Sequence, residues 1–183
     1  MRCKSLTAML LIGVAASQAQ ADPRFLAPGD LLPESGVGVT DPMVFFPDMR
    51  FPMESGPAYA NSSAALIGGR NGPEGDSCDP SNYSYPWRDN FCEYRRMDLA
   101  VCGAGGHMGQ DLRPATCEKG VHWTVAATDG VVSHIGRFAV TVQSPDGALH
   151  RYIHLDMDSV TLSPLDRVKQ GDRIGTVSNG WLS

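Results

Sequence analysis

The stretch Cys-Gly-Ala-Gly-Gly-His-Met-Gly-Gln-Asp-Leu-Arg-Pro-Ala-Thr-Cys, from Cys102 to Cys117, decides how the fold of this chain is interpreted. At its centre, His107 and Asp111 place an imidazole and a carboxylate four residues apart. These groups are two of the three protein ligands of a typical catalytic zinc site, which leaves its fourth position open for water. A glycine-rich surface turn is the alternative explanation for the same five positions.

The spacing of these two side chains requires a bent backbone. In a flat strand, four residues span roughly 13 Å, which is too far for two ligands that each sit about 2 Å from one ion. A helix would bring the two positions together, but the four glycines within residues 103–109 disfavour a helix. We therefore expect a glycine-bent or bulged strand on which the two ligands converge.

Residues 1–21 have the features of a secretory signal peptide. Arg2 and Lys4 precede a short apolar run, and Ala19-Gln20-Ala21 is a cleavage site of the small-x-small kind. The run is shorter than the roughly 20 residues that cross a bilayer. We predict a mature chain that begins at Asp22, has no transmembrane segment, and is exported to the periplasm or the extracellular space.

The charge of the chain argues against two classes of partner. Cleavage would remove Arg2 and Lys4 and no acidic residue, which leaves 13 basic against 20 acidic residues, a net charge of −7. An acidic protein is a poor candidate for binding nucleic acid or an anionic membrane through bulk charge. We expect no nucleic-acid partner.

Four cysteines remain after cleavage, namely Cys78, Cys92, Cys102 and Cys117. An even number of cysteines in an oxidising compartment favours disulfides, and four cysteines allow three connectivities. We favour the sequential pairing, Cys78–Cys92 and Cys102–Cys117. A zinc-binding cysteine cluster is the alternative, but the chain has no C-x-x-C pair and the compartment favours disulfides.

Residues 22–97 are predicted to form an irregular arm with a disulfide loop. They contain ten of the thirteen prolines, and proline removes ladder donors and interrupts helices. Eight aromatic side chains between residues 45 and 91 give this segment apolar surface that disordered segments lack. We expect the arm to pack on the following domain, and an aromatic groove for a glycan or peptide is the alternative.

Residues 98–183 have the pattern of an all-β domain. Short apolar or alternating runs are separated by turn signals, of which Pro145-Asp146-Gly147 is the clearest hairpin signal. Strands are expected at 123–127, 131–135, 138–143 and 149–155, with further short strands between 160 and 177. This spacing predicts a small antiparallel β-barrel or sandwich.

Within residues 149–155 the sequence alternates. Leu149, Ile153 and Leu155 would lie on one face of the strand, and the opposite face would carry a tyrosine and two histidines, including His154.

Four motifs in this domain resemble those of one family, the lysostaphin-type (LytM-like) zinc metalloendopeptidases. Gly-His-Met-Gly-Gln-Asp-Leu at 106–112 resembles their H-x-G-x-D motif, and Val-Ala-Ala-Thr-Asp-Gly-Val-Val at 125–132 resembles the hairpin that follows it. Tyr-Ile-His-Leu at 152–155 resembles their Y-x-H-L strand, and Val-Lys-Gln-Gly-Asp-Arg-Ile-Gly at 168–175 resembles their V-x-x-G-x-x-I-G segment. The four motifs occur in the family's order and spacing.

The resemblance implies a small antiparallel β-barrel with an open groove, and zinc-dependent hydrolysis of peptide bonds in peptidoglycan. It also implies that His107 and Asp111 are Zn²⁺ ligands and that His154 is the catalytic histidine, which positions water or stabilises the transition state. Peptidoglycan peptides are the expected partners.

The sequence departs from the family at one point. The family closes its site with an H-x-H motif on a late strand, which supplies the third zinc ligand, and no histidine follows His154 in this chain. Neither His122, His134 nor His150 is a convincing replacement. We favour a fragment of a longer reading frame. The alternative is a catalytically inactive domain that binds peptidoglycan or activates a separate wall hydrolase.

Overall fold

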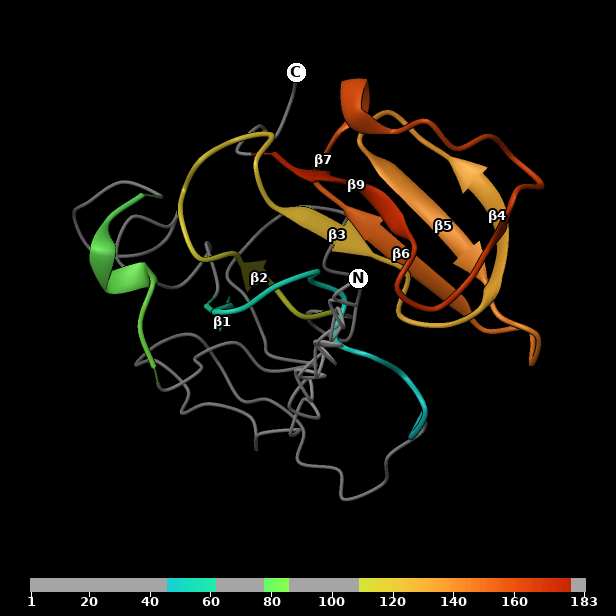
Figure 1. Cartoon of the computed structure of the whole chain (residues 1–183), viewed down its shortest axis with the longest axis horizontal. Coiled ribbons are helices and arrows are strands. Elements are labelled where there is room, and N and C mark those ends of the chain that lie inside the picture. The colour runs from blue at the N-terminus through green and yellow to red at the C-terminus, as the bar shows by residue number, and fades with distance from the viewer. Residues whose placement is uncertain (1–45, 62–77, 86–108, 179–183) are drawn as a thin grey trace, which may run out of the picture.

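The structure, a computed structural model, describes residues 46–61, 78–85 and 109–178. Its regular elements are short strands and single 3₁₀ turns (Figure 1). In chain order they are β1 (Tyr59–Ala60), η1 (Pro80–Asn82), β2 (Leu112–Arg113), β3 (Trp123–Val125), β4 (Gly130–Ile135), β5 (Ala139–Gln143), β6 (Leu149–Ile153), β7 (Leu155–Asp156), η3 (Met157–Ser159), β8 (Arg167–Val168) and β9 (Arg173–Val177).

The largest sheet has the strand order β6-β5-β4-β8, and each neighbouring pair is antiparallel. The predicted turn at residues 145–147 joins β5 to β6, and Gly147 there has a φ of 90°, a conformation that glycine adopts without steric cost. This hairpin sets a register in which Ala139 pairs with Ile153.

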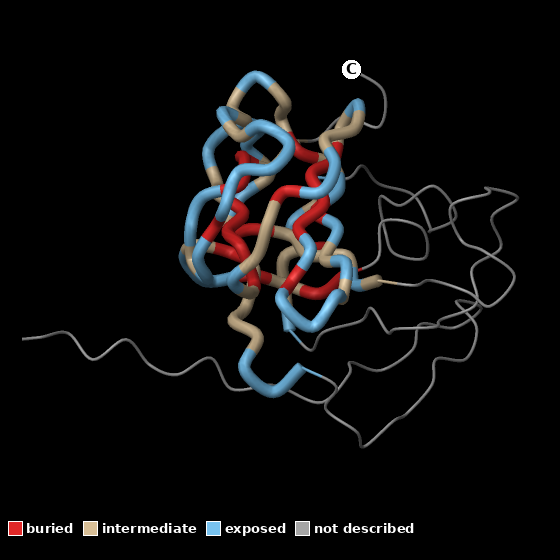
Figure 2. Tube along the Cα trace, turned by 90° about the vertical axis from the view of Figure 1, so that its right-hand side faces the viewer, coloured by how far each residue is buried: buried red, intermediate tan, exposed pale blue. Residues whose placement is uncertain are grey.

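A second sheet has the order β3-β9-β7, again with antiparallel pairs. We call residues 123–178, which carry both sheets, the β-core. Figure 2 shows the buried residues gathered inside this part of the molecule, with exposed loops around them. Most of its core side chains are aliphatic, with valine the most frequent, because β-branched side chains pack well on a pleated surface. The buried cluster consists of Ala126, Ala127, Val132, Val140, Val142, Tyr152, Leu155, Val168 and Ile174.

The predicted all-β antiparallel class is therefore confirmed for the described residues. Their strands form three separate sheets rather than one closed barrel.

The segment 149–155 differs from the prediction of a single alternating strand. The structure divides it at His154, whose φ of 62° lies in the left-handed region. Leu155 is 4% exposed, whereas Leu149 and Ile153 are 64% and 45% exposed. The prediction that these three side chains share a face is wrong because the left-handed residue resets the alternation and sends the chain into the second sheet.

The third sheet is the pair β1-β2, in which Tyr59 lies opposite Arg113. We call residues 58–61, 78–85 and 109–113 the β1–β2 region. Its centre is polar, since the buried Asn61 side chain donates hydrogen bonds to the carbonyls of Asn82 at 2.7 Å and Ser84 at 3.2 Å.

Part of the predicted arm lies along the edge of β3. The Val125 amide donates to the Pro52 carbonyl at 2.9 Å, and the Glu54 amide donates to the Trp123 carbonyl at 3.0 Å. This segment therefore covers backbone groups that an edge strand would otherwise present to other chains.

Two predicted boundaries, the signal-peptide end at residue 21 and the arm's end at residue 97, lie outside the described residues. In the part of the chain that is described, no helix has the length and apolar character needed to cross a membrane.

Candidate active site

Asp111 is half-buried and lies immediately before β2. The strand begins at Leu112, which pairs with Ala60 of β1, so the small sheet fixes the backbone next to Asp111. The other predicted zinc ligand of this motif, His107, lies outside the described residues. The described half of the predicted metal motif therefore belongs to the β1–β2 region and not to the β-core.

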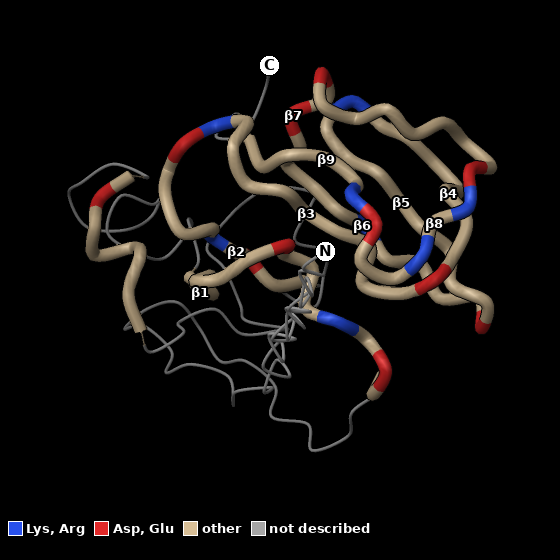
Figure 3. Tube along the Cα trace, in the orientation of Figure 1, with Lys and Arg blue, Asp and Glu red and all other residues tan. Residues whose placement is uncertain are grey.

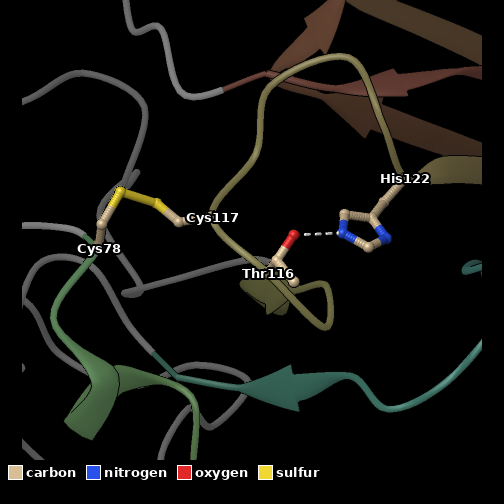
Figure 4. The surroundings of a disulfide bond; sticks show 4 residues. All are labelled: Cys78, Thr116, Cys117 and His122. Carbon is tan, nitrogen blue, oxygen red and sulfur yellow. Dashed lines mark hydrogen bonds between the residues drawn. A yellow bond between two sulfur atoms is a disulfide. The ribbon is translucent and has the colours of Figure 1, made fainter.

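A disulfide joins Cys78 to Cys117, with the two Cα atoms 5.4 Å apart (Figure 4). The predicted sequential pairing is therefore wrong, because it joined Cys78 to Cys92 and Cys117 to Cys102. The latter two lie outside the described residues. Pairing depends on proximity in space, and here the segment around η1 lies beside the loop after β2, although the two cysteines are 39 residues apart in sequence.

Residues 114–122, which we call the connecting loop, link the β1–β2 region to β3. The Gly120 amide donates to the Val177 carbonyl at 3.0 Å, and the Val177 amide donates to the His122 carbonyl at 2.8 Å. These bonds attach the connecting loop to the end of β9. The next residue, Ser178, donates its amide hydrogen to the His154 carbonyl, so His154 is held at the same end of β9.

His122 is a member of this loop with a partner of its own. Its Nε2 atom lies 2.7 Å from the Thr116 hydroxyl, so that the two side chains close the loop beside the disulfide (Figure 4). The His122 side chain therefore has a hydrogen-bond partner within the connecting loop.

His154, the predicted catalytic residue, lies between β6 and β7 with a φ of 62°. The Ser178 amide donates to its carbonyl at 2.9 Å, and the following Leu155 amide donates to the Phe138 carbonyl at 3.1 Å. Its imidazole stacks on the Phe138 ring, with centroids 5.6 Å apart and planes inclined by 7°.

Phe138 is the site residue that the sequence analysis missed. The register Ala139–Ile153 places Phe138 opposite His154 at the next position of the hairpin. The turn at residues 145–147 carried this information, because counting outward from it pairs the two residues.

Tyr152, the first residue of the Y-x-H-L motif, anchors β6 to the core. It is 8% exposed, and its hydroxyl oxygen accepts a hydrogen bond from the Ala127 amide at 2.7 Å. Burial raises the pKa of this phenol, although the bond from Ala127 opposes the rise. The side chain is therefore neutral at physiological pH, and it fixes the strand that leads to His154.

The remaining described histidines lie in other surroundings. The His150 Nε2 atom lies 3.3 Å from the Ser144 hydroxyl, and the Phe46 ring meets the imidazole edge-on at 5.3 Å. His134 is exposed on β4. Within the three described ranges, no group of three or more His, Cys, Asp or Glu side chains is placed to hold a metal ion.

Two of the motifs quoted above contact each other in the structure. Asp129, in the motif at 125–132, accepts hydrogen bonds at 2.8 Å from the Lys169 ammonium group and from the Gln170 amide, both in the motif at 168–175. The bond from Lys169 lowers the pKa of the Asp129 carboxyl, with a further contribution from the Gln170 amide. Acidic and basic residues lie side by side around the loop between β8 and β9 (Figure 3).

No protein-family model, curated protein or solved structure matches this chain. The resemblance to the lysostaphin-type peptidases therefore rests on the four sequence motifs alone.

Proposed function

We propose that this protein is an exported zinc-dependent metalloendopeptidase of the lysostaphin type, which hydrolyses peptide bonds of bacterial peptidoglycan. In this proposal His107 and Asp111 are zinc ligands, and His154 is the catalytic histidine. The finer fold, a lysostaphin-type domain with an open groove, is part of the same proposal.

The observation that carries the proposal is the conformation of His154. A residue other than glycine at positive φ costs of order 1–3 kcal/mol, and such residues cluster at active sites, where the surrounding structure enforces them. At His154 the enforcing contacts are the two backbone hydrogen bonds and the stacked ring described above. Among the described residues other than glycine, His154 and Leu165 have positive φ, and His154 is the histidine to which the motif assigns the chemistry.

A histidine in this place suits peptide hydrolysis. When bound, zinc would polarise the scissile carbonyl and lower the pKa of a coordinated water towards 7. The His154 imidazole would accept a proton as the water attacks, or donate a hydrogen bond to the oxyanion that develops on the carbonyl. Its ring nitrogens can do either, because a neutral imidazole carries one donor and one acceptor.

The side chains of this motif are of the kinds that bind zinc, but the motif supplies one ligand fewer than a catalytic zinc site normally has. Imidazole nitrogen and carboxylate oxygen are common ligands of catalytic zinc, which takes three protein ligands. The motif in this chain supplies two, His107 and Asp111, and in the family the third ligand comes from an H-x-H strand. We therefore expect the 183-residue chain to hold zinc weakly and not to cleave peptidoglycan peptides measurably.

The test is a digest of purified peptidoglycan, with and without a chelator, by two proteins. One is the 183-residue chain without its signal peptide, and the other is the same reading frame extended through an H-x-H strand. The extended protein should release peptides in a chelator-sensitive reaction, and His107→Ala should abolish it. His134→Ala, a change at an exposed histidine on β4, is the matched control and should leave the rate unchanged.

Two other results would change the assignment. Chelator-sensitive cleavage by the 183-residue chain would show that the third ligand comes from within this sequence. Binding of peptidoglycan by the extended protein without any cleavage would favour the second candidate, a non-enzymatic domain that binds the wall or activates a separate hydrolase. The ligand count of the motif is the observation that keeps this second candidate open.

A further inference from the structure

The rings of Phe138 and His154 form a parallel stack. Their planes differ by 7° at a centroid separation of 5.6 Å, which is the offset-stacked arrangement that aromatic pairs favour. The contrast within the same hairpin is His150, whose aromatic neighbour Phe46 meets it edge-on at an interplanar angle of 72°. Stacking fixes the plane of an imidazole, whereas an edge contact leaves that plane less constrained.

Phe138 also holds the backbone of the same junction. Its carbonyl accepts the hydrogen bond from the Leu155 amide at 3.1 Å, immediately after the left-handed residue. Phe138 therefore makes two contacts at this junction. Its ring stacks on the His154 imidazole, and its carbonyl accepts the hydrogen bond from the Leu155 amide. Only the ring contact depends on the identity of the side chain at position 138.

We infer that Phe138 is a positioning residue, whose ring sets the plane of the His154 imidazole and so directs its nitrogen atoms. The inference rests on the proposed function for its consequence, because proton transfer requires the imidazole nitrogen within hydrogen-bond reach of the reacting group.

The kinetic test uses the extended protein. Phe138→Leu keeps an apolar side chain and the backbone carbonyl but removes the aromatic face, so kcat should fall roughly 10- to 100-fold, the range seen when residues that orient a functional side chain are lost. KM and zinc content should not change. Phe138→Tyr retains the aromatic face and should restore the rate. Phe46→Leu, which removes the edge-on partner of His150, is the matched control and should leave kcat unchanged.

A second readout does not require activity. Because the two rings lie side by side with nearly parallel planes, the ring current of Phe138 should displace the carbon-bound proton resonances of the His154 imidazole in the proton NMR spectrum. His154 should show this displacement relative to the exposed His134, and should lose it in Phe138→Leu but keep it in Phe138→Tyr and Phe46→Leu.

The two readouts separate the two proposals. If the wild-type extended protein cleaves nothing, and Phe138→Leu nevertheless removes the displacement of the His154 resonances, the stacking role is upheld and the proposed function is ended. Full kcat in Phe138→Leu, or His154 resonances that do not respond to it, would overturn the positioning role while leaving the peptidase function intact. A matched loss of kcat in Phe46→Leu would also overturn it, because the effect would then not be specific to the stacked ring.

Discussion

The β-core and the β1–β2 region are held together by different interactions. The β-core encloses a cluster of aliphatic side chains between two sheets, with Val132, Val140 and Val142 fully buried. The β1–β2 region has two-residue strands, a buried asparagine with polar partners, and a disulfide to the adjoining loop. Apolar burial stabilises without directional partners, whereas the second region depends on a few specific bonds.

This difference matters because the proposed site draws on both regions. Asp111 precedes a strand of the β1–β2 region, and His154 lies in the β-core. The connecting loop joins the two, through its disulfide at one end and its hydrogen bonds to Val177 at the other. We therefore expect that Asp111, the proposed metal ligand, can be disturbed without unfolding the β-core, which carries the proposed catalytic histidine.

The largest expected effect follows from removing the disulfide with Cys78→Ser and Cys117→Ser. For a sequence separation of 39, the loop-entropy relation gives a contribution of about 4 kcal/mol. Amide hydrogen exchange should become fast at Ala60 and Leu112 while β5 keeps its protection. Equal loss of protection in β5 would show that the two regions unfold as one unit.

A smaller loss, confined to the other region, is expected from Ile174→Ala. The side chain is 1% exposed in the β-core, and truncating a buried isoleucine to alanine costs about 2–5 kcal/mol. The matched control is Ile153→Ala, at a position that is 45% exposed, where we expect roughly 1 kcal/mol or less. Urea denaturation monitored by circular dichroism measures both, and equal losses would contradict the assignment of the core.

The next effect in size is expected for Asn61→Ala. This change removes the donor to the Asn82 and Ser84 carbonyls, and leaving buried acceptors unsatisfied costs about 1–3 kcal/mol. The matched control is Ser84→Ala, which removes only an exposed hydroxyl bond to Ser81. Hydrogen exchange at Leu112 should rise in the first variant and not in the second, and the reverse order would contradict a polar centre for this region.

The smallest effect is expected where the arm meets the β-core. The Arg173 guanidinium donates to both Glu54 carboxylate oxygens, at 2.6 and 3.0 Å, and its hydrogen bond lowers the pKa of Glu54. A lowered folded-state pKa adds stability above the carboxyl's usual pKa of about 4.3, and this is lost as pH falls through the lowered value. Glu54→Gln should therefore lower the melting temperature slightly at pH 7, and the difference from wild type should shrink as pH falls below the usual carboxyl pKa. A difference that stays the same at acid pH or in high salt would mean that the pair acts through packing and not charge.

The sequence predicted the local features of the β-core well. The hairpin at residues 145–147 and the strands around it follow from turn chemistry and alternation, which are properties of neighbouring residues. Gly130 in the Asp-Gly turn has a further reason that only the structure reveals, since a Cβ atom there would lie 2.5 Å from the Gln143 carbonyl oxygen.

Features that depend on distant segments were not predictable in the same way. The Cys78–Cys117 bond requires the η1 segment to lie beside the connecting loop, and nothing in the linear order of the cysteines reveals this. The left-handed turn at His154 was hidden because the residue sits in an alternating run, and the enrichment of histidine at positive φ is a much weaker signal than a glycine would have been. Asp111 lies immediately before β2, whereas its convergence with His107 on a bent strand concerns residues outside the described ranges and stays a prediction.

The most direct measurement of the central claim is the zinc content of two variants of the extended protein, Asp111→Ala and His154→Ala, together with their rates of peptidoglycan hydrolysis. We predict that both lose nearly all activity, but that only Asp111→Ala loses its zinc, because in the proposed function Asp111 is a zinc ligand and His154 acts in the transition state. Retention of zinc by Asp111→Ala, or its loss from His154→Ala, would contradict the division of roles between the β1–β2 region and the β-core.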